Sequence, residues 1–532
     1  MSGRTDPEAG QYFQALVSSQ NGLYYHPFLR NEPAGVEAQS YALAALAETG
    51  SAPRVSLNDQ EQSALHEEAV AMSALWGRYS LIAFRRAGAS RVLGPSDVEA
   101  VRGLRREDGL YQDPDLDTRD TAALVGSTWA ALEVLHAVGA LEDLPADAIS
   151  ATAGRLRRLA DSTEDLSEAG ALATSLRLLS QPVPEHLARL RAPSMERFTS
   201  LSADERTARL VDTYGYVQVR ESSGERPVLD TAAWRQVLRH NAGTLDYEQL
   251  FYAVHILRST GPAEPALDAA RRRLEGNRLR NGTVRDPDTY SGSLDASLWV
   301  ERLRSLAGWT TRDRRLTLAL DDTARSAGHG PDDDGDRARA ALRRLAGPPG
   351  RPTASPACED RRLLPTPLTV DNAPQWQRGV MECVEAGGSV PVPTVRRWRL
   401  NTPSRVAAVA ALVVGLRSAH HGDAVPDWVT AKALAPWARN PARFTSVHDY
   451  AQVVRAHLIL GGDLEDGLRS ALRRGVGPYK GCPGTPDLYR TGGPDPGCDL
   501  RTTWAVWALD RQTRGALGAL PPSAAPAATE GK

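Results

Sequence analysis

The sequence predicts an all-α protein, specifically an α/α toroid in which two concentric rings of helices pack around a centre. Strand signals are nearly absent, and apolar residues recur at three- and four-residue spacing along most of the chain. That spacing is the periodicity of amphipathic helices. A unit of one loop and one helix also recurs six times, and repeats of this kind stack into closed or solenoidal arrays. The repeats permit either one interrupted barrel or two packed barrels.

The repeated unit starts with a loop of glycine and aromatic residues, passes an acidic residue and ends in a helix rich in Ala, Leu and Trp. In the clearest copy, Gly477 and Tyr489 precede Asp499, and Trp504 lies on the helix. The copies occur, in chain order, at 20–49, 108–139, 214–238, 281–307, 398–416 and 477–509. We expect their helices to form the inner ring and the more charged helices between them to form the outer ring.

Two segments interrupt the repeats. Residues 327–357 carry an acidic cluster and a stretch rich in Pro, Gly and Ser, and residues 387–403 are punctuated by Pro. The predicted organisation is therefore toroid repeats over 1–346, a linker or insertion at 347–357, and further repeats over 358–518. The last of these either close the same barrel or form a second one. Residues 519–532 are predicted to be a disordered tail.

Composition excludes some classes of function. The 63 Lys and Arg residues nearly balance the 65 Asp and Glu residues, which argues against a nucleic-acid groove that binds through overall charge. No export signal is visible, and the longest apolar run, 406–416, is too short to span a bilayer. The four cysteines have no zinc-ligand spacing and are expected to be free thiols in a reducing cytosol. A Cys482–Cys498 loop disulfide is the alternative. The predicted location is cytoplasmic.

The acidic residue before each repeat helix has two interpretations. The acids are Glu37, Asp120, Asp230, Asp295 and Asp499. A carboxylate there caps a helix by accepting backbone N–H groups. Alternatively, several carboxylates around one barrel mouth would raise the pKa of one of them and make it a catalytic acid.

Aromatic residues on the repeat helices also have two interpretations. They are Tyr41, Trp129, Trp234, Trp299, Trp504 and Trp507. Most large apolar residues at helical spacing pack in a core. Rings that line a cavity instead stabilise cations without offering a nucleophile, which suits a reaction that passes through carbocations.

The repeats resemble the prenyltransferase/squalene-cyclase repeat. The resemblance is carried by Gly/aromatic loops followed by a helix of the "ST-W-A-x-x-x-L" type. It is best at 20–49, 108–139, 281–307 and 477–509, about a quarter of the chain. "SQNGLYYHP" resembles a degenerate copy of that superfamily's glutamine–tryptophan repeat, with Gln20, Gly22 and Tyr24 at the positions of Gln, Gly and Trp. Zinc-dependent branches of the superfamily are not indicated, because no matching Cys and His context is present.

Resemblance to class II terpene cyclases implies a general acid in a D-x-D-D motif. "LALDDTARSA" keeps Asp321 and Asp322, but Ala319 replaces the first Asp. Asp321 would then be the acid and Asp322 its hydrogen-bonded support. The second candidate is Asp115-x-Asp117-Thr118, which resembles the D-x-D-T variant. The alternative for both segments is an ordinary acidic helix start.

Two further features bear on a diphosphate substrate. Asp332, Asp333 and Asp336 fit the D-D-x-x-D motif with which class I terpene synthases hold Mg²⁺, although their Gly and Pro neighbours favour a solvated loop. Lys480, Arg490 and Arg501 are candidates to bind the diphosphate. Mg²⁺ would accompany that substrate and would not be held by the protein alone.

The leading functional prediction is a class II-like terpene cyclase, an isomerase or lyase of isoprenoid secondary metabolism. Its substrate would be a polyisoprenoid, with or without a diphosphate. An Asp would donate a proton, and an aromatic wall of Tyr41, Trp129, Trp234, Trp299 and Trp504 would stabilise the cation until proton loss or water capture ends the reaction. One alternative is a non-catalytic toroid that binds partners, and the other is a carbohydrate-active α/α barrel with two carboxylates.

Overall fold

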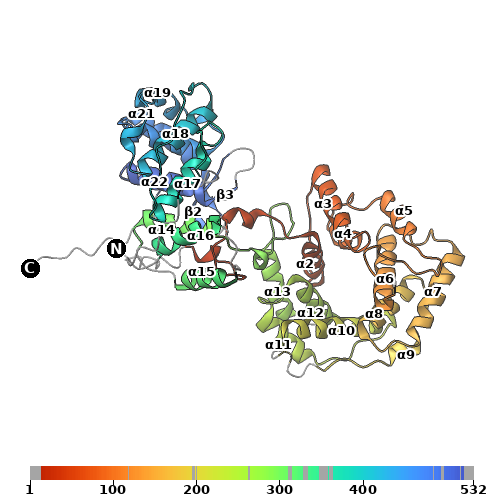
Figure 1. Cartoon of the computed structure of the whole chain (residues 1–532). Coiled ribbons are helices and arrows are strands. Elements are labelled where there is room, and N and C mark those ends of the chain that lie inside the picture. Colours follow the sequence, from red (N-terminus) through yellow and green to blue (C-terminus); the bar gives the residue numbers. More distant parts are fainter. Residues whose placement is uncertain are drawn as a thin grey trace, which may run out of the picture. The chain divides into compact units, whose positions relative to one another are not determined.

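The computed structural model describes residues 13–519 except 118, 195–197, 199–200, 262–263, 310–313, 327–332, 347–357, 359–363, 483–484, 493–496 and 516. The chain is 61% helical, and the described residues form 21 α-helices and one three-stranded sheet (Figure 1). The prediction of a mainly helical chain is confirmed.

The chain divides into two compact units. The inserted unit is Glu32–Pro287, and the split unit combines Met1–Asn31 with Asp288–Lys532. These boundaries differ from the predicted division at residues 346–358. The physical reason is that the helices between residues 288 and 346 pack against helices after residue 372, which joins them in one unit. The predicted linker at 347–357 and nearly all of the predicted tail lie outside the described residues.

The inserted unit contains twelve helices in its described residues. They are α2 (Val36–Glu48), α3 (Asp59–Met72), α4 (Trp76–Arg86), α5 (Pro95–Gly103), α6 (Thr121–Ala137), α7 (Ala146–Ala160), α8 (Leu166–Leu178), α9 (Glu185–Ala188), α10 (Ala203–Ser222), α11 (Thr231–Asn241), α12 (Tyr247–Ser259) and α13 (Glu264–Gly276). Contacts run in a cycle from α2 through α4, α6, α8, α10 and α12 back to α2. The other helices pack on members of this cycle, α3 on α4 and α7 on α8 among them (Figure 1).

The burial pattern of each helix follows from its place in this cycle. In α8 every residue from Ala169 to Ser175 is buried, because the helix has neighbours on all sides. In α7 burial is limited to Thr152, Ala153, Leu156 and Ala160, a single stripe at helical spacing. Thus α8 carries small and apolar residues all round, whereas α7, outside the cycle, carries one buried stripe.

Two glycines allow α8 and α10 to pack closely. A Cβ added at Gly215 would lie 2.1 Å from the Leu166 carbonyl oxygen, and one at Gly170 would lie 2.6 Å from the Gly215 Cα. We expect Gly215→Ala to lower the free energy of unfolding by about 1–3 kcal/mol, because backbone must move and the roughly 1 kcal/mol gain in helix propensity does not offset this. Gly154→Ala on α7 is the control. Only the Arg158 side chain lies near its added Cβ. Urea denaturation showing equal effects of the two substitutions would contradict the prediction.

The split unit also contains a cycle of helix contacts. Its helices are α14 (Leu294–Ala307), α15 (Arg314–Ser326), α16 (Asp333–Ala346), α17 (Ala373–Glu385), α18 (Pro403–Ser418), α19 (Ala431–Ala438), α20 (Val447–Ile459), α21 (Asp466–Val476) and α22 (Leu500–Gln512). The cycle runs from α14 through α16, α17, α18, α20 and α22 back to α14 (Figure 1). The expected loop at Asp333 and Asp336 is wrong, since both residues lie in the first turns of α16.

The predicted Gly/aromatic loops are small hairpins. Three of them are closed by isolated bridges, Val17 to Tyr24, Arg105 to Tyr111 and Arg278 to Val284. Each turns at a glycine with positive φ: Gly22 at 71°, Gly109 at 90° and Gly282 at 85°. Positive φ is disfavoured for side chains with a Cβ, which explains the recurring glycine. The final copy is larger, with β1 (Lys480–Cys482), β2 (Thr485–Arg490) and β3 (Cys498–Asp499) forming an antiparallel sheet.

The first hairpin packs on α14, a helix far from it in sequence. The Tyr24 backbone N–H donates to the Ser297 hydroxyl of α14 over 3.0 Å. This repeats the bond from the Tyr111 N–H to Thr128 of α6, also 3.0 Å. Conversely, the hairpin that precedes α14 in sequence stays with the inserted unit, where the Ala34 N–H donates to the Val284 carbonyl. The hairpin of the first copy thus packs with the helix of the 281–307 copy, and the hairpin of the 281–307 copy pairs with the segment before the helix of the first copy. The exchange occurs where the chain passes between the units.

The four cysteines are paired, so the expectation of free thiols is wrong. Cys358 pairs with Cys383 of α17, and Cys482 of β1 pairs with Cys498 of β3. The second pair is the one that the sequence left open. Such pairs persist in oxidising compartments, which a cytoplasmic location does not ordinarily provide.

The cysteine pairs give a direct prediction. Denatured protein purified without reductant should take up no iodoacetamide by intact mass, and reduced protein should take up four labels. Replacing Cys482 and Cys498 by Ser should lower the free energy of unfolding by about 3 kcal/mol, because the bond closes a short loop in the unfolded chain. Four labels before reduction would contradict the pairing.

Candidate functional site

A cavity of small-molecule size lies at the centre of the inserted unit's helix cycle. Its volume is about 590 Å³, within the range of small-molecule sites. All six helices of the cycle contribute to its wall. Five aromatic side chains line it: Tyr41, Tyr79, Trp129, Tyr214 and Phe251.

The cavity does not lie where the acidic helix starts are. Its lining runs from Ser40 to Glu48 on α2, from Trp129 to His136 on α6 and from Tyr214 to Ser222 on α10. These are the middle and last turns of the helices. The expectation that the hairpins and the first-turn acids surround the central cavity is therefore wrong for this unit.

The acids that precede the repeat helices are mainly caps. Asp120, Asp230 and Asp499 each accept two backbone N–H groups at the start of α6, α11 and α22. Asp295 and Glu37 do not cap, since Ser293 caps α14 and Gly35 precedes α2 without a side-chain bond. The capping interpretation is confirmed for three of the five positions.

The rings on the cavity wall form two groups, Tyr79 with Trp129 and Phe251 with Tyr41 and Tyr214. Tyr79 and Trp129 have centroids 4.9 Å apart, and Phe251 lies 5.8 Å from Tyr41 and 5.6 Å from Tyr214. Burial raises the pKa of the Tyr41, Tyr79 and Tyr214 hydroxyls, with nearby Glu carboxylates adding to the effect. The hydroxyls therefore stay neutral over the whole physiological range, and the wall presents uncharged rings.

A charged cluster lies at the end of the cavity formed by the last turns of the helices. His255 Nδ1 is 3.2 Å from a Glu48 oxygen, and Nε2 is 3.3 Å from a Glu221 oxygen. Arg258 also pairs with Glu48, and the Ser259 hydroxyl donates to Glu221 over 2.5 Å. Burial alone would lower the pKa of His255, but the two carboxylates outweigh it and raise the pKa to about 9. At neutral pH the cluster is an imidazolium between two carboxylates.

Glu133 is a further carboxylate on the cavity wall. It lies one turn after Trp129 on α6, and its side chain is 16% exposed. Its ion-pair partner in the described residues is Arg86, at 3.9 Å. Its charge contributes to the raised pKa of Tyr79 and Tyr214, which places it close to both rings. Unlike Glu48 and Glu221, Glu133 forms no ion pair with His255 in the described residues.

Only part of the predicted aromatic wall lines this cavity. Tyr41 and Trp129 do. Trp234 is fully buried on α11, outside the helix cycle, where its ring lies 6.0 Å from that of Phe198. Trp299 and Trp504 belong to the split unit, with ring centroids 5.6 Å apart. Trp507 is fully buried near Trp309.

Asp115 and Asp117 do not line the cavity, and Asp321 belongs to the split unit. Asp321 is 56% exposed on α15 and faces Arg343 at 3.6 Å. The side chain of Asp322 lies outside the described residues. Asp115 and Asp117 are exposed, and Asp117 accepts the Arg119 N–H in a turn. Asp115, Asp117 and Asp321 are thus exposed carboxylates and not desolvated acids. The proposal below therefore uses a carboxylate that lines the cavity.

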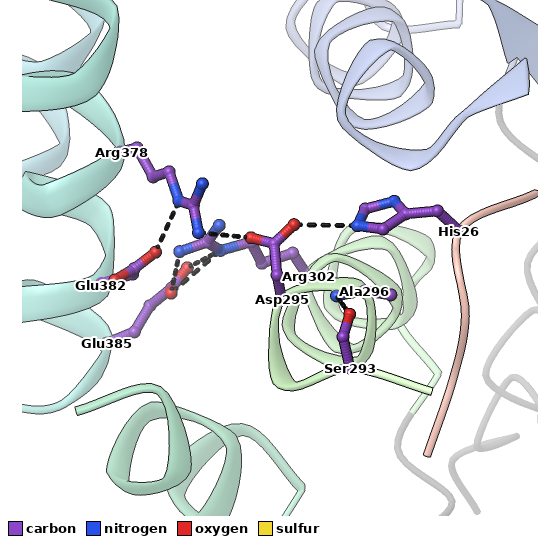
Figure 2. A network of polar contacts seen from close by, with 8 residues as sticks. All are labelled: His26, Ser293, Asp295, Ala296, Arg302, Arg378, Glu382 and Glu385. Atoms are coloured by element: carbon purple, nitrogen blue, oxygen red, sulfur yellow. Dashed lines mark hydrogen bonds and ion pairs between the residues drawn. The ribbon is translucent and has the colours of Figure 1, made fainter. Parts of the chain in front are cut away.

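The split unit carries a polar network at the start of α14 (Figure 2). Asp295 joins His26, at 2.9 Å, to Arg378 of α17, at 2.7 Å. Burial alone would raise the pKa of Asp295, but the His26 hydrogen bond and the Arg378 charge lower it overall. Arg302 forms a bidentate pair with Glu385, with Nε–Oε1 and Nη2–Oε2 distances of 2.8 and 2.7 Å. Its guanidinium also lies over the Trp299 ring at 4.3 Å.

A second, much smaller void adjoins this network. Its volume is about 10 Å³, and Trp299, Trp504, Arg378 and Arg501 contribute to its lining. Arg501 thus lies inside the split unit and not on the loop with the other two predicted diphosphate ligands. Arg490 donates to the Pro478 carbonyl over 2.8 Å, and Lys480 pairs with Asp487 at 3.0 Å.

Within the described residues, no three His, Cys, Asp or Glu side chains are placed to hold a metal ion. Asp332 lies outside the described residues, as do the side chains of Asp333 and Asp336. The same part of the chain contains no helix with the length and apolar character needed to cross a membrane. No protein-family model matches the chain, and no curated protein is significantly similar to it.

Proposed function

We propose that each unit is an α/α toroid and that the inserted unit encloses the substrate. The closed cycles of helix contacts support this, as does a cavity to which all six helices of one cycle contribute. The inner ring is then α2, α4, α6, α8, α10 and α12. The inserted unit's cavity is about 590 Å³, and a void of about 10 Å³ lies among α14, α17, α20 and α22 of the split unit.

The proposed function is cyclisation of an isoprenoid in the cavity of the inserted unit. The observation that carries it is the set of five uncharged aromatic rings around a space of drug-molecule size. Ring faces attract cations, and phenol and indole groups offer no strong base to end a carbocation early. The aromatic part of the wall also suits a hydrocarbon chain, whose burial is favourable by about 25 cal/mol per Å². Charged residues such as Glu133 and Arg177 make up part of the rest of the wall.

Glu133 is the proposed proton donor. A class II-like reaction begins when an acid adds a proton to a substrate alkene or epoxide, leaving a carbocation that the next double bond attacks. Glu133 lies among Trp129, Tyr79 and Tyr214, where that cation would form. Glu48 and Glu221 are held by His255. After ring closure, loss of a proton to water or capture of water ends the sequence. The proposal uses no metal ion.

The test is incubation with geranylgeranyl diphosphate, farnesyl diphosphate and squalene, with products read by mass spectrometry. Wild type should give a cyclised product, and Glu133→Gln should reduce its rate at least 100-fold, the usual size of a lost general acid. Asp321→Ala and Asp117→Ala test the acids predicted from the motifs. Glu99→Gln, at a residue 75% exposed on α5, is the matched control. If an Asp variant loses the product and Glu133→Gln does not, the proton donor is that Asp and not Glu133. If wild type gives no product from any of the substrates, cyclisation is refuted.

A non-catalytic apolar-ligand carrier is the second candidate. It is favoured by one observation, the exposure of Asp321 and Asp117, which leaves the degenerate motifs without a desolvated acid. A carrier would quench Trp129 fluorescence on binding a non-hydrolysable farnesyl analogue and would return every substrate unchanged. Quenching that requires Trp129, together with no product, would select this candidate over the cyclase.

A further inference from the structure

The side chains on the wall of the inserted unit's cavity lie at two levels. The ring level consists of Tyr41, Tyr79, Trp129, Tyr214 and Phe251. The polar level lies nearer the ends of the helices and consists of Glu48, Arg86, Glu133, His136, Arg177, Gln218, Glu221, Ser222 and His255. On α2, α4, α6 and α10 a polar residue follows the ring by two helical turns, as Glu48 follows Tyr41. The two then share a face of the helix, with their Cα atoms about 10 Å apart.

Contacts within each level show that its residues are neighbours around the wall. The ring contacts join α4 to α6 and join α12 to both α2 and α10. At the polar level, His255 joins Glu48 to Glu221. Arg86 lies 3.9 Å from Glu133. A ligand that fills the cavity therefore meets uncharged rings at one end and polar side chains at the other, which favours an amphiphile.

The charges of the polar level balance. Its carboxylates and cations are Glu48, Glu133 and Glu221 against Arg86, Arg177 and protonated His255. Arg258 also pairs with Glu48, but it does not line the cavity and is 58% exposed. An anionic head group would be set against three carboxylates, and a cationic one against three cations. The balance therefore favours a head group without net charge.

Several uncharged hydrogen-bonding groups of the polar level are open to a ligand. The side chains of Gln218 and Ser222, one turn apart on α10, form no hydrogen bond with any described residue, and neither does the imidazole of His136 on α6. An amide and a hydroxyl each offer both a donor and an acceptor. A hydroxyl on the ligand offers both as well, so it can satisfy either kind of group.

We infer that the cavity takes an isoprenoid alcohol, with its hydroxyl at the polar level and its hydrocarbon chain at the ring level. This inference names the substrate class of the proposed cyclase and rests on that function in placing an isoprenoid in the cavity. Gln218 and Ser222 bind the hydroxyl. A prenyl diphosphate still enters the cavity but binds at least tenfold more weakly, because its charge is set against the carboxylates.

The experiment compares four ligands that share one chain and differ in the head group: farnesol, farnesylamine, farnesoic acid and farnesyl diphosphate. Calorimetric titration of the full wild-type chain should show farnesol binding at least tenfold more tightly than each charged ligand. Tighter binding of any charged ligand, or no binding of farnesol, would overturn the inference. Mass spectrometry of the same samples tests cyclisation separately. Farnesol that binds and returns unchanged would count against the cyclase alone, and a cyclised product with preference for the diphosphate would count against the alcohol alone.

Two variants test whether the polar level sets the preference. Gln218→Leu should weaken farnesol binding about tenfold and leave binding of farnesane, the hydrocarbon without a head group, unchanged. Glu133→Gln removes one carboxylate and should shift the preference between farnesoic acid and farnesol about tenfold toward the acid. Glu99→Gln, at a residue 75% exposed on α5, should change neither. An unaltered preference in Glu133→Gln would show that charge balance does not select the ligand. The comparison of head groups uses the wild-type chain, so it does not depend on the folding of a variant.

Discussion

Glu385→Leu should lower the free energy of unfolding of the split unit by about 3–5 kcal/mol. The Arg302 side chain is 2% exposed, and its bidentate partner is Glu385 (Figure 2). Without that carboxylate, a guanidinium packed on Trp299 would remain buried and uncompensated. The loss is largely the cost of the orphaned charge and not the worth of the pair. Hydrogen exchange of α14 and α17 in urea would measure it.

A second substitution separates these two explanations. Arg302→Met combined with Glu385→Leu removes both charges and should recover most of the stability lost in Glu385→Leu alone, because no buried charge is left unpaired. The exposed pair Arg439–Glu465, with side chains 52% and 56% exposed, is the control, and Glu465→Gln should cost no more than about 1 kcal/mol. If the double variant is as unstable as the single one, the pair itself and not the orphaned charge holds α14 to α17.

Stability of the inserted unit should fall as pH rises from about 6.5 to about 9. His255 holds its proton more tightly in the folded chain, where its pKa is about 9, than in the unfolded chain, where an ordinary value near 6.5 applies. The stabilisation is complete below 6.5 and is lost as His255 deprotonates. Its size is on the order of 3 kcal/mol. Glu48 and Glu221, whose pKa values are lowered overall by His255, work in the opposite direction, and their contribution is lost in acid.

The signature of this cluster is proton release on unfolding. At pH 8, calorimetry in buffers of different ionisation enthalpy should detect close to one proton released per His255 on unfolding, and His255→Gln should abolish that release and flatten the slope between 6.5 and 9. His136→Gln removes another histidine of the same cavity and should keep the slope. A slope that survives in His255→Gln would show that other groups cause it.

Local features were predictable from sequence because they depend on neighbouring residues. Asp120, Asp230 and Asp499 cap helices as the motif suggests, and the hairpin glycines adopt positive φ. Which helices close each cycle was not predictable from sequence. His255 and Glu48 are 207 positions apart, and no local pattern joins them.

Trp234 shows why some site residues were assigned to the wrong place. It follows the same Asp-Thr-Ala pattern as the helix of Trp129, yet α11 carries Arg235 and Arg239 and packs outside the cycle. The following helix, α12, has buried residues on most of its faces and supplies Phe251 and His255. In α8 and α12 burial on most faces accompanies a place in the cycle, but α4 and α10 belong to it and carry several charged residues. No such signal marks Tyr79 on α4 or Tyr214 on α10.

The exchange of hairpins sets an order of events on the ribosome. The segment containing Tyr24 emerges first, but its partner Ser297 is made only after the whole inserted unit. At about 5–20 residues per second, the delay is roughly 13–55 s. During that interval a hairpin rich in Tyr and Leu stays unpacked while residues 32–287 are synthesised and fold. A stalled or truncated chain would therefore leave this apolar segment exposed, and a chaperone would bind there.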